Sequence, residues 1–331
     1  MIALAVSLYS KIKGSRKQET GNRVTINKPD LNETESFSLD DLRYTHQRDY
    51  FKSGITVCQN EGLQFSAGCE VEVTSNIPIQ AGCSSSSSIM VGWIHFLSHM
   101  ADKPINWQPD KIAELAYKAE VLEFGEPGGI MDQYSTAMGD LIYLESEPKI
   151  SIRKLSLNLG VFVLGDSGEP KDTMGILQRC RDNLLTIINK VKIQNPDFDL
   201  HSCDSDFGID GLNDDEKVLL EGTIRNRDLL RQALQELEKD APDHDLIGQL
   251  FSEHHSVLRD VLNVSTPKIE SMLEGALEAG ALGGKIVGSG GGGCMFAYAP
   301  ENSDVVAEAI EKAGGKGYII EPTEGSRNLT S

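Results

Sequence analysis

Residues 78–100 read PIQAGCSSSSSIMVGWIHFLSHM, a run of small residues that passes directly into an apolar segment. Apolar residues recur at helical spacing from Ile89 to Leu97, so the stretch predicts a loop that enters a helix, with serines available as caps. Backbone N–H groups at such a helix start can approach phosphate oxygens, and the helix dipole favours their negative charge. Taken alone, the stretch can equally be a serine-rich linker with a good N-cap.

A second loop is rich in glycine. Residues 284–296 read GKIVGSGGGGCMF, and β-like segments flank the glycines on both sides. Glycine permits positive φ and close backbone approach, so this loop can fold over a phosphate or brace another loop that does. It is neither a Walker A motif nor a Rossmann turn that opens a helix. A flexible hairpin is the alternative interpretation.

Two carboxylates lie on either side of a third loop. Residues 119–133 read AEVLEFGEPGGIMDQ, with Glu120 near the end of one predicted helix and Asp132 at the start of the next. The Gly/Pro turn between them can bring both carboxylates to one cleft, where they could bind a metal ion or move a proton. A solvated surface pair is the alternative interpretation.

The rest of the chain predicts an α+β protein. At 331 residues it is long enough for two lobes, and we place their boundary near residue 150, giving domains 1–150 and 151–331. Strands are expected at 2–9, 23–26, 37–39, 69–73, 141–144, 150–155, 161–164, 285–287, 294–299 and 317–320. Helices are expected at 84–100, 109–123, 130–138, 174–191, 215–237, 244–258, 266–279 and 303–312, the last with Ser303 as N-cap. We expect residues 194–214 to be an acidic surface excursion and the tail from Gly325 to be loose.

Composition narrows the possible partners. The chain has 31 Lys and Arg against 50 Asp and Glu, a net charge of −19, which disfavours nucleic acid and anionic membrane surfaces. The six cysteines include no C-x-x-C pair, which argues against a zinc site or disulfide framework and favours a reducing, cytoplasmic location. The first ten residues lack the features of a signal peptide. His254 and His255 are neighbours that face different sides of a helix, so a shared metal is not expected.

The three segments, in this order, resemble the GHMP kinase family. Residues 78–88 resemble its second motif, residues 120–139 its galactokinase Gly-Ile-Met-Asp-Gln segment, and residues 288–294 its third motif. The resemblance spans about residues 65–322 and includes 166–168, 221–227 and 254–270. It implies a two-lobed α+β fold, with an N-terminal ribosomal S5 domain 2-like lobe that binds ATP and a C-terminal ferredoxin-like lobe.

The resemblance also implies roles for individual residues. Ser86 and Glu120 would hold Mg²⁺ on the phosphates of ATP, and Asp132 would accept the proton of the substrate hydroxyl. Such roles suit phosphoryl transfer, which depends on positioning and on neutralising phosphate charge. Asp166 is a further candidate substrate ligand, or simply the end of a strand. The expected nucleotide-binding positions are Gly82, Ser84, Ser85, Ser86, Ser87, Gly288, Gly290 and Gly291.

The sequence departs from the family pattern in three places. Cys83 stands where the family usually has Leu, and Ser87 where it usually has Ala, changes that we expect to alter packing only. The family's first motif, a Pro-Gly-Arg strand followed by Gly-Glu-His-x-Asp-Tyr, is not found here. Residues 2–8 resemble the strand that follows that motif, so we expect a start that is truncated relative to the family.

These observations favour an ATP-dependent kinase that phosphorylates a monosaccharide hydroxyl. The anomeric hydroxyl of galactose is the first expectation, and a heptose, fucose or a uronic acid are alternatives. A catalytically weak regulatory protein that binds sugar and ATP is a hypothesis from another class, motivated by the absence of the first motif. An unrelated structural α/β protein with Ser- and Gly-rich linkers is the third. The sequence makes no prediction about the oligomeric state.

Overall fold

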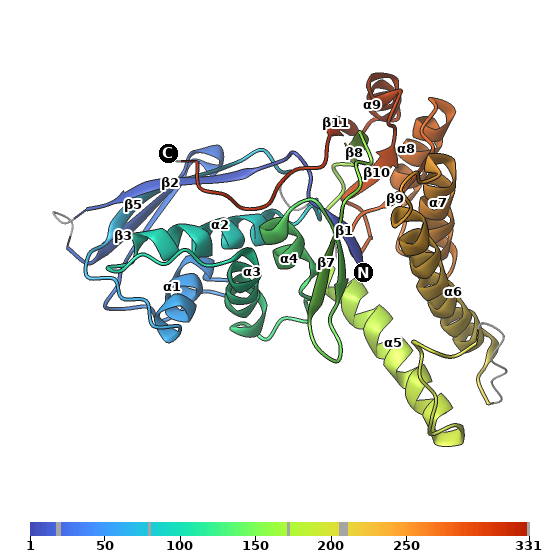
Figure 1. The fold of residues 1–331 in the computed structure, drawn as a ribbon, viewed down its shortest axis with the longest axis horizontal. Coiled ribbons are helices and arrows are strands. Elements are labelled where there is room, and N and C mark those ends of the chain that lie inside the picture. Colours follow the sequence, from blue (N-terminus) through green and yellow to red (C-terminus); the bar gives the residue numbers. More distant parts are fainter. Residues whose placement is uncertain (18–20, 79–80, 171–172, 205–210, 330–331) are drawn as a thin grey trace. The chain divides into compact units, whose positions relative to one another are not determined.

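The computed structural model describes residues 1–331 except 18–20, 79–80, 171–172, 205–210 and 330–331 (Figure 1). The chain divides into two compact units. Unit 1 comprises Met1–Pro78, Ser84–Ser156 and Pro322–Ser331, and unit 2 comprises Ile79–Cys83 and Leu157–Glu321. The main division therefore falls between residues 156 and 157, and two short segments belong to the unit on the other side of it.

Unit 1 is built on a mixed four-stranded sheet. Its strand order is β2-β5-β3-β4, formed by β2 (Ser10–Arg16), β5 (Cys69–Ser75), β3 (Arg23–Lys28) and β4 (Glu33–Ser38). β3 pairs in parallel with β5, and the outer pairs are antiparallel. Along β5 the buried Val71 and Val73 alternate with the exposed Glu70 and Glu72, so one face of the sheet turns to the core and the other to solvent.

The apolar face of this sheet is covered by helices (Figure 1). They are α1 (Tyr50–Asn60), α2 (Ser85–Met100), α3 (Pro109–Tyr117), a π-helical turn (Lys118–Leu122) and α4 (Met131–Met138), with a short 3-10 turn (Pro29–Leu31) between β3 and β4. Trp93 of α2 is fully buried, stacks on Phe96 and donates its indole N–H to the carbonyl of Phe51. A smaller antiparallel sheet, β1-β6-β7, completes the unit with β1 (Ile2–Leu4), β6 (Leu141–Glu145) and β7 (Ser151–Leu155).

Two predictions for unit 1 are wrong. The expected strand at 2–9 ends at Leu4, and a separate strand follows at Ser10–Arg16 because that segment pairs with β5 along its whole length. The helix α1 lies between the strands expected at 37–39 and 69–73, where we predicted no helix. Its β-branched and aromatic residues have weak helix propensity, and packing of its buried face against the unit 1 core overrides that preference.

Unit 2 contains an antiparallel sheet of order β11-β8-β10-β9. The strands are β8 (Phe162–Asp166), β9 (Gly283–Ile286), β10 (Cys294–Tyr298) and β11 (Lys316–Ile320). The helices are α5 (Thr173–Gln194), α6 (Asp214–Leu237), α7 (His244–Asp260), α8 (Pro267–Glu278) and α9 (Ser303–Lys312). With one helical connection between β8 and β9 and another between β10 and β11, this is the ferredoxin-like β-α-β-β-α-β pattern.

Local details correct two further expectations and add to a third. Asn302, and not Ser303, occupies the N-cap of α9, without a side-chain capping bond. The tail is attached as far as Ser326, whose N–H donates to the carbonyl of Thr136 and whose hydroxyl bonds His95 Nδ1 at 2.7 Å. The excursion at 194–214 is also held in place, because Arg227 donates to the carbonyls at 200 and 203; its residues 205–210 lie outside the described residues.

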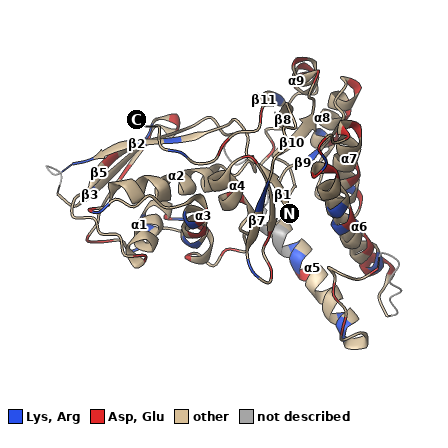
Figure 2. Cartoon of the chain, viewed as in Figure 1, with Lys and Arg blue, Asp and Glu red and all other residues tan. Residues whose placement is uncertain are grey.

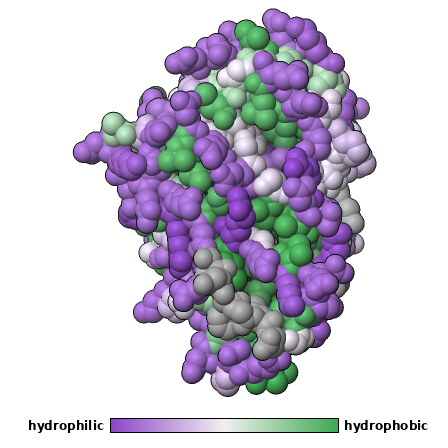
Figure 3. Space-filling model, turned by 90° about the vertical axis from the view of Figure 1, so that its right-hand side faces the viewer, coloured by the Kyte–Doolittle hydropathy of each residue, from purple (hydrophilic) through white to green (hydrophobic). Residues whose placement is uncertain are grey.

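The distribution of charged and polar residues over the structure agrees with the acidic composition of the chain. Figure 2 marks Asp and Glu positions in red along the elements of both units. Hydrophilic residues cover most of the face drawn in Figure 3, around smaller apolar patches. All six cysteines are free thiols. Among the described residues, no helix combines the length and apolar character needed to cross a membrane.

Candidate active site

The loop at residues 81–84 enters α2 through two left-handed residues. Gly82 has φ 77° and Ser84 has φ 57°, and α2 begins at Ser85. Ser84 occupies the N-cap, yet its side chain makes no capping hydrogen bond, so the expectation that these serines cap the helix is wrong at this position. The first turn also lacks an acidic residue. A helix start without a side-chain cap or a carboxylate leaves its N–H groups suited to an anion. Ile79 and Gln80, at the front of the quoted segment, lie outside the described residues.

Glu120 is a buried carboxylate held by a glutamine. It lies in the π-helical turn that follows α3, and its side chain is among the buried charged groups of unit 1, with 5% exposure. Gln133 of α4, also buried, donates from Nε2 to Glu120 Oε2 at 2.7 Å and to Ser87 Oγ at 3.3 Å. Single π-helical turns are frequent at functional sites. Sequence reasoning missed Gln133, although it directly follows Asp132 in the quoted segment.

The groups that shift the pKa of Glu120 include the other predicted carboxylate, Asp132, and the predicted serine, Ser86. Burial raises the pKa of Glu120, and hydrogen bonds with Gln133, Ser86 and Ser87 oppose that rise. The charge of Asp132 raises the pKa of Glu120 further. Ser86 and Asp132 therefore each lie within interaction range of Glu120 in unit 1. A buried carboxylate beside a second one is stabilised in its charged form by a cation.

These residues fit a magnesium ion. Gln133 Oε1 is buried and receives no hydrogen bond from the described residues, so an oxygen acceptor stands beside the Glu120 carboxylate. Oxygen donors such as a carboxylate, an amide and the Ser86 hydroxyl are the ligands that Mg²⁺ takes, together with water and phosphate oxygens. In the part of the chain that the structure describes, no group of three or more His, Cys, Asp or Glu could hold a metal. The site thus suits Mg²⁺ that arrives with phosphates, and does not suit an all-protein metal cage.

Asp132 lies in the first turn of α4, where a carboxylate is favoured by the helix dipole. The side chain is partly exposed, in contrast to Glu120. The turn at residues 123–129 connects it to the π-helical turn that carries Glu120. The positions of both acids thus depend on the conformation of that turn.

In unit 2 the glycine-rich loop uses its backbone to brace residue 81. Gly293 has φ 74°, and a Cβ there would lie 2.4 Å from the carbonyl oxygen of Ala81, so a side chain cannot be accommodated. The N–H of Cys294 donates to that same carbonyl at 3.0 Å. The N–H of Gly291 donates to the carbonyl of Val264 at 2.6 Å. Since these amides have protein partners, the loop supports its neighbour, one of the two roles expected for it.

Ser167 ties the same loop to β8, and sequence reasoning did not single it out. Its hydroxyl donates to the carbonyl of Gly293 at 2.6 Å, and its N–H donates to the same oxygen at 3.0 Å. Asp166, the last residue of β8, accepts the N–H of Gly168 at 2.9 Å. The carboxylate of Asp166 therefore has a local structural partner, and its role toward a substrate stays a prediction.

The histidine pair has a structural environment, as expected. His255 Nε2 lies 2.8 Å from Glu270 Oε1, and its Nδ1 accepts the N–H of Ile286 at 3.3 Å. Burial lowers the pKa of His254 to about 3, with contributions from Lys285 and His255. His255 thereby takes part in the packing of α7 on β9, and the neighbouring His254 is half-buried and neutral near pH 7.

Comparison with known proteins places the chain in a family. Residues 49–140 match the GHMP kinases N terminal domain, and residues 230–317 match the GHMP kinases C terminal domain. A mevalonate kinase of Thermococcus gammatolerans is 29% identical over 297 residues, covering 87% of this chain and 79% of the relative. A galactokinase of Clostridium perfringens is 27% identical over 292 residues, covering 84% of this chain and 74% of the relative.

A solved structure supports the same fold. The crystal structure of Lactococcus lactis galactokinase complexed with galactose superposes with a TM-score of 0.80 at 19% identity, covering 99% of this chain and 89% of that one. The predicted two-lobed α+β GHMP kinase fold is thereby confirmed. The relatives are kinases, phosphotransferases that act on an alcohol group. This chain belongs to the GHMP kinase family.

Proposed function

We propose that this protein is an ATP-dependent sugar kinase that transfers the γ-phosphoryl group of ATP to a monosaccharide hydroxyl, with the anomeric hydroxyl of galactose as the first candidate. The observation that carries this proposal is the arrangement around Glu120. A buried carboxylate is held by Gln133 at 2.7 Å, and Asp132 of the same helix start acts on it electrostatically. Glutamine and aspartate come from the Gly-Ile-Met-Asp-Gln segment that resembles galactokinases.

Asp132 serves as the proton acceptor in this proposal. The acceptor hydroxyl gives its proton to the Asp132 carboxylate while its oxygen forms a bond to the γ-phosphorus, and ADP leaves with the bridging oxygen of the broken bond. A carboxylate in the first turn of a helix is favoured in its charged form by the helix dipole. Such a base accepts the proton of a hydroxyl that is positioned next to it.

Ser86 and Glu120 bind the metal in this proposal, with Gln133 completing the set of oxygen donors. Mg²⁺ held there supplies neutralisation of phosphate charge. The hydrogen bonds from Ser86, Ser87 and Gln133 counteract the effect of burial on Glu120 and keep the carboxylate available as a ligand.

The backbone N–H groups from Gly82 to Ser86 bind the β- and γ-phosphates in this proposal. Two left-handed residues aim this segment into α2, whose first turn has no carboxylate to compete for the amides. The loop with Gly288, Gly290 and Gly291 supports residue 81, since the N–H of Cys294 fixes that carbonyl at 3.0 Å. Backbone donors of this kind recognise phosphate in an otherwise acidic protein.

Mevalonate phosphorylation is the second candidate. It is favoured by the curated relatives, because mevalonate kinases of Thermococcus and Pyrococcus species match this chain at 27–31% identity. The galactokinase-like segment at residues 128–133 favours the sugar. Among sugars, a heptose, fucose or a uronic acid stay alternatives to galactose.

The test is coupled-assay release of ADP with Mg-ATP against galactose, a panel of other monosaccharides and mevalonate. We expect turnover with one monosaccharide and its loss in Asp132→Asn. Turnover with mevalonate alone would replace the sugar assignment while preserving the kinase. Mg-ATP binding without turnover on any acceptor would contradict the proposal and support a regulatory role that acts through a partner.

A further inference from the structure

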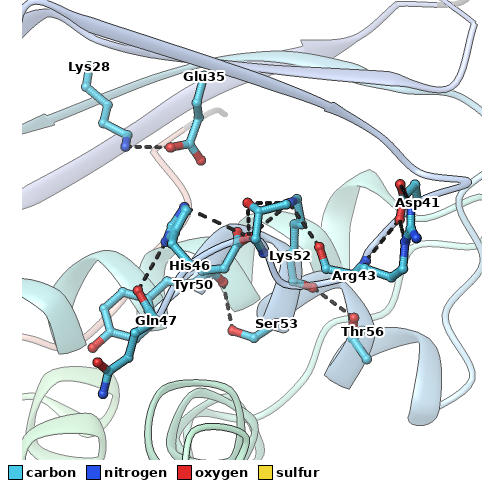
Figure 4. A network of polar contacts seen from close by, with 12 residues as sticks. Lys28, Glu35, Asp41, Arg43, His46, Gln47, Tyr50, Lys52, Ser53 and Thr56 are labelled. Carbon is cyan, nitrogen blue, oxygen red and sulfur yellow. Dashed lines mark hydrogen bonds and ion pairs between the residues drawn. The ribbon is translucent and has the colours of Figure 1, made fainter.

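The segment that precedes α1, residues 43–49, is folded around a buried ion pair. Lys52 Nζ donates to Asp49 Oδ2 at 2.9 Å, and both side chains are nearly inaccessible to solvent. Lys52 also donates to the carbonyl of Arg43 at 3.1 Å (Figure 4). Asp49 Oδ2 accepts the N–H of Thr45 at 3.1 Å. Loss of either partner would leave a buried charge uncompensated, so this network holds the segment in one conformation.

Two side chains of this segment bind the turn at residues 123–129, which connects Glu120 to Asp132. Arg48 donates from Nε to Glu126 Oε1 at 2.5 Å and from Nη2 to Glu126 Oε2 at 2.9 Å. Tyr44 donates from its hydroxyl to Glu123 Oε2 at 2.6 Å. The Arg48 contact is bidentate, a geometry that fixes orientation as well as distance.

The backbone at Arg48 supports a specific role for this residue. Arg48 has φ 64°, in the left-handed region, which costs a residue with a side chain about 1–2 kcal/mol. The N–H of Tyr50 donates to the carbonyl of Arg48 at 2.7 Å and holds this conformation. Glu126 is the more buried partner, with 11% side-chain exposure against 47% for Arg48. Unfavourable backbone conformations that are kept by the surrounding structure often serve a site.

Aromatic contacts reinforce the same junction. Phe124 lies in the turn, and its ring centroid is 5.2 Å from that of Tyr44 and 5.8 Å from that of Tyr50. The turn itself has glycine at 125, 128 and 129, so its free backbone would sample many conformations. The N–H of Glu126 donates to the carbonyl of Val121 at 3.1 Å at the start of the turn, and the external contacts restrict the turn further.

We propose that Arg48 and Glu126 form a clamp that positions Glu120 and Asp132 for phosphoryl transfer. This inference rests on the proposed function of those two acids, and Arg48 is a positioning residue because it acts through the turn. The charge of Glu120 is close enough to act on Arg48, so the guanidinium lies within electrostatic range of Glu120 as well as on the turn. Displacement of a catalytic group by about 1 Å can lower the rate about 100-fold.

The first test measures steady-state kinetics of the full chain with its best acceptor. Arg48→Ala and Glu126→Ala should each lower kcat about 10- to 100-fold, with the KM for ATP changed less than about 3-fold. The double variant should lose no more than the worse single variant, because the two side chains act as one pair. Arg48→Lys keeps the charge without the fork and should recover only part of the activity.

Arg16→Ala is the matched control. Arg16 belongs to the same unit and donates to Ser66 Oγ at 3.1 Å and to Asp102, far along the chain from the acids. Its loss removes a comparable set of surface contacts and should leave kcat within about 2-fold. Losses in the single variants that add in the double variant, or a normal kcat in Arg48→Ala, would overturn the clamp.

The second test needs no acceptor and separates the clamp from the proposed function. Amide hydrogen exchange across residues 123–133 should become faster in Arg48→Ala and in Glu126→Ala, and stay unchanged in Arg16→Ala. Unchanged exchange in the first two variants would overturn the clamp even if the protein is an active sugar kinase. Faster exchange in a chain that phosphorylates no acceptor would support the clamp as a device that holds the turn and would count only against the proposed function.

Discussion

The acids of unit 1 and the glycine-rich loop of unit 2 are built from different parts of the chain. Around Glu120 the contacts are made by side chains, with Gln133 and Ser87 as partners. Around Gly293 most contacts are made by backbone groups, at residues 81, 167, 169, 264 and 291–294, and the Ser167 hydroxyl adds one side-chain donor. In unit 1 the identity of the side chain decides what a position can do, whereas in unit 2 the absence of one decides it.

The comparison predicts that substitutions in the two regions have different effects. A substitution among the acids that keeps the shape should remove chemistry and spare the fold. A substitution in the glycine-rich loop should disturb the fold and the loop it supports, whatever the chemistry of the new side chain.

The largest expected effect is that of Asp132→Asn on turnover. Asparagine keeps the size and can hydrogen-bond the acceptor, yet it cannot take up the proton, so kcat should fall about 10²- to 10⁴-fold. Binding of Mg-ATP, measured by calorimetry, should change little. Asp110→Asn is the matched control, since Asp110 is likewise the acidic residue in the first turn of its helix and is exposed. Equal losses in both variants would show that a helix-dipole effect, and not the base, was measured.

Whether a site residue could be predicted from the sequence depends on its chemical type. The segments around Asp132 and Gly293 were predicted from residue types, and the helix α4 and strand β10 lie where expected. Gln133 and Ser167 were missed because an amide and a hydroxyl have no distinctive pattern until the partner is located.

The number of glycines predicted that the backbone of this loop has a role, but not whether the backbone binds a ligand or supports a neighbouring loop. Positive φ can serve a ligand or a neighbouring loop equally well, and only the bond from Cys294 to residue 81 distinguishes the two. The contact of Arg48 could not be predicted from the sequence either, because its partner Glu126 is 78 residues away. The left-handed backbone of Arg48 has no sequence signature.

The second prediction tests the backbone side of the comparison. Gly293→Ala should lower the free energy of unfolding by about 2–4 kcal/mol, since the new Cβ meets a carbonyl oxygen 2.4 Å away in a left-handed conformation. Gly62→Ala is the control for φ alone, because Gly62 has φ 93° and nothing within 4 Å of its Cβ position. It should cost about 1 kcal/mol. Urea unfolding checks both values, and equal losses would mean that the contact with residue 81 contributes nothing.

The third prediction concerns the pH dependence of stability that a titratable group of unit 2 causes. His254 in unit 2 has its pKa lowered to about 3 by burial, whereas a histidine in the unfolded chain has its pKa near 6.5. Between these values the unfolded state binds a proton that the folded state does not, so stability falls as the pH falls below 6.5. From pH 7 to pH 5 this group should remove about 2 kcal/mol.

Urea unfolding at both pH values measures this effect. His254→Gln should shrink the difference in stability between pH 7 and pH 5 by that amount, and replacement of the exposed His201 by Gln should leave it unchanged. An unaltered difference in His254→Gln would show that this histidine does not limit stability at acid pH. In either case turnover should be spared by His254→Gln at pH 7, because the proposed function assigns this residue no role.

The smallest expected effect is that of Ser87→Ala, which separates the supporting hydroxyl from the acids. Gln133 Nε2 keeps its 2.7 Å bond to Glu120 when the 3.3 Å bond to Ser87 Oγ is removed, so the carboxylate keeps its strongest neutral donor. The loss should be about 0.5–1.5 kcal/mol in unfolding free energy, the usual net value of one hydrogen bond. We expect kcat to change less than about 3-fold, as suits a position where the family usually has Ala. A loss of turnover as large as that of Asp132→Asn would mean that this hydroxyl takes part in the chemistry, and the side-chain site of unit 1 would then extend from the acids into the first turn of α2.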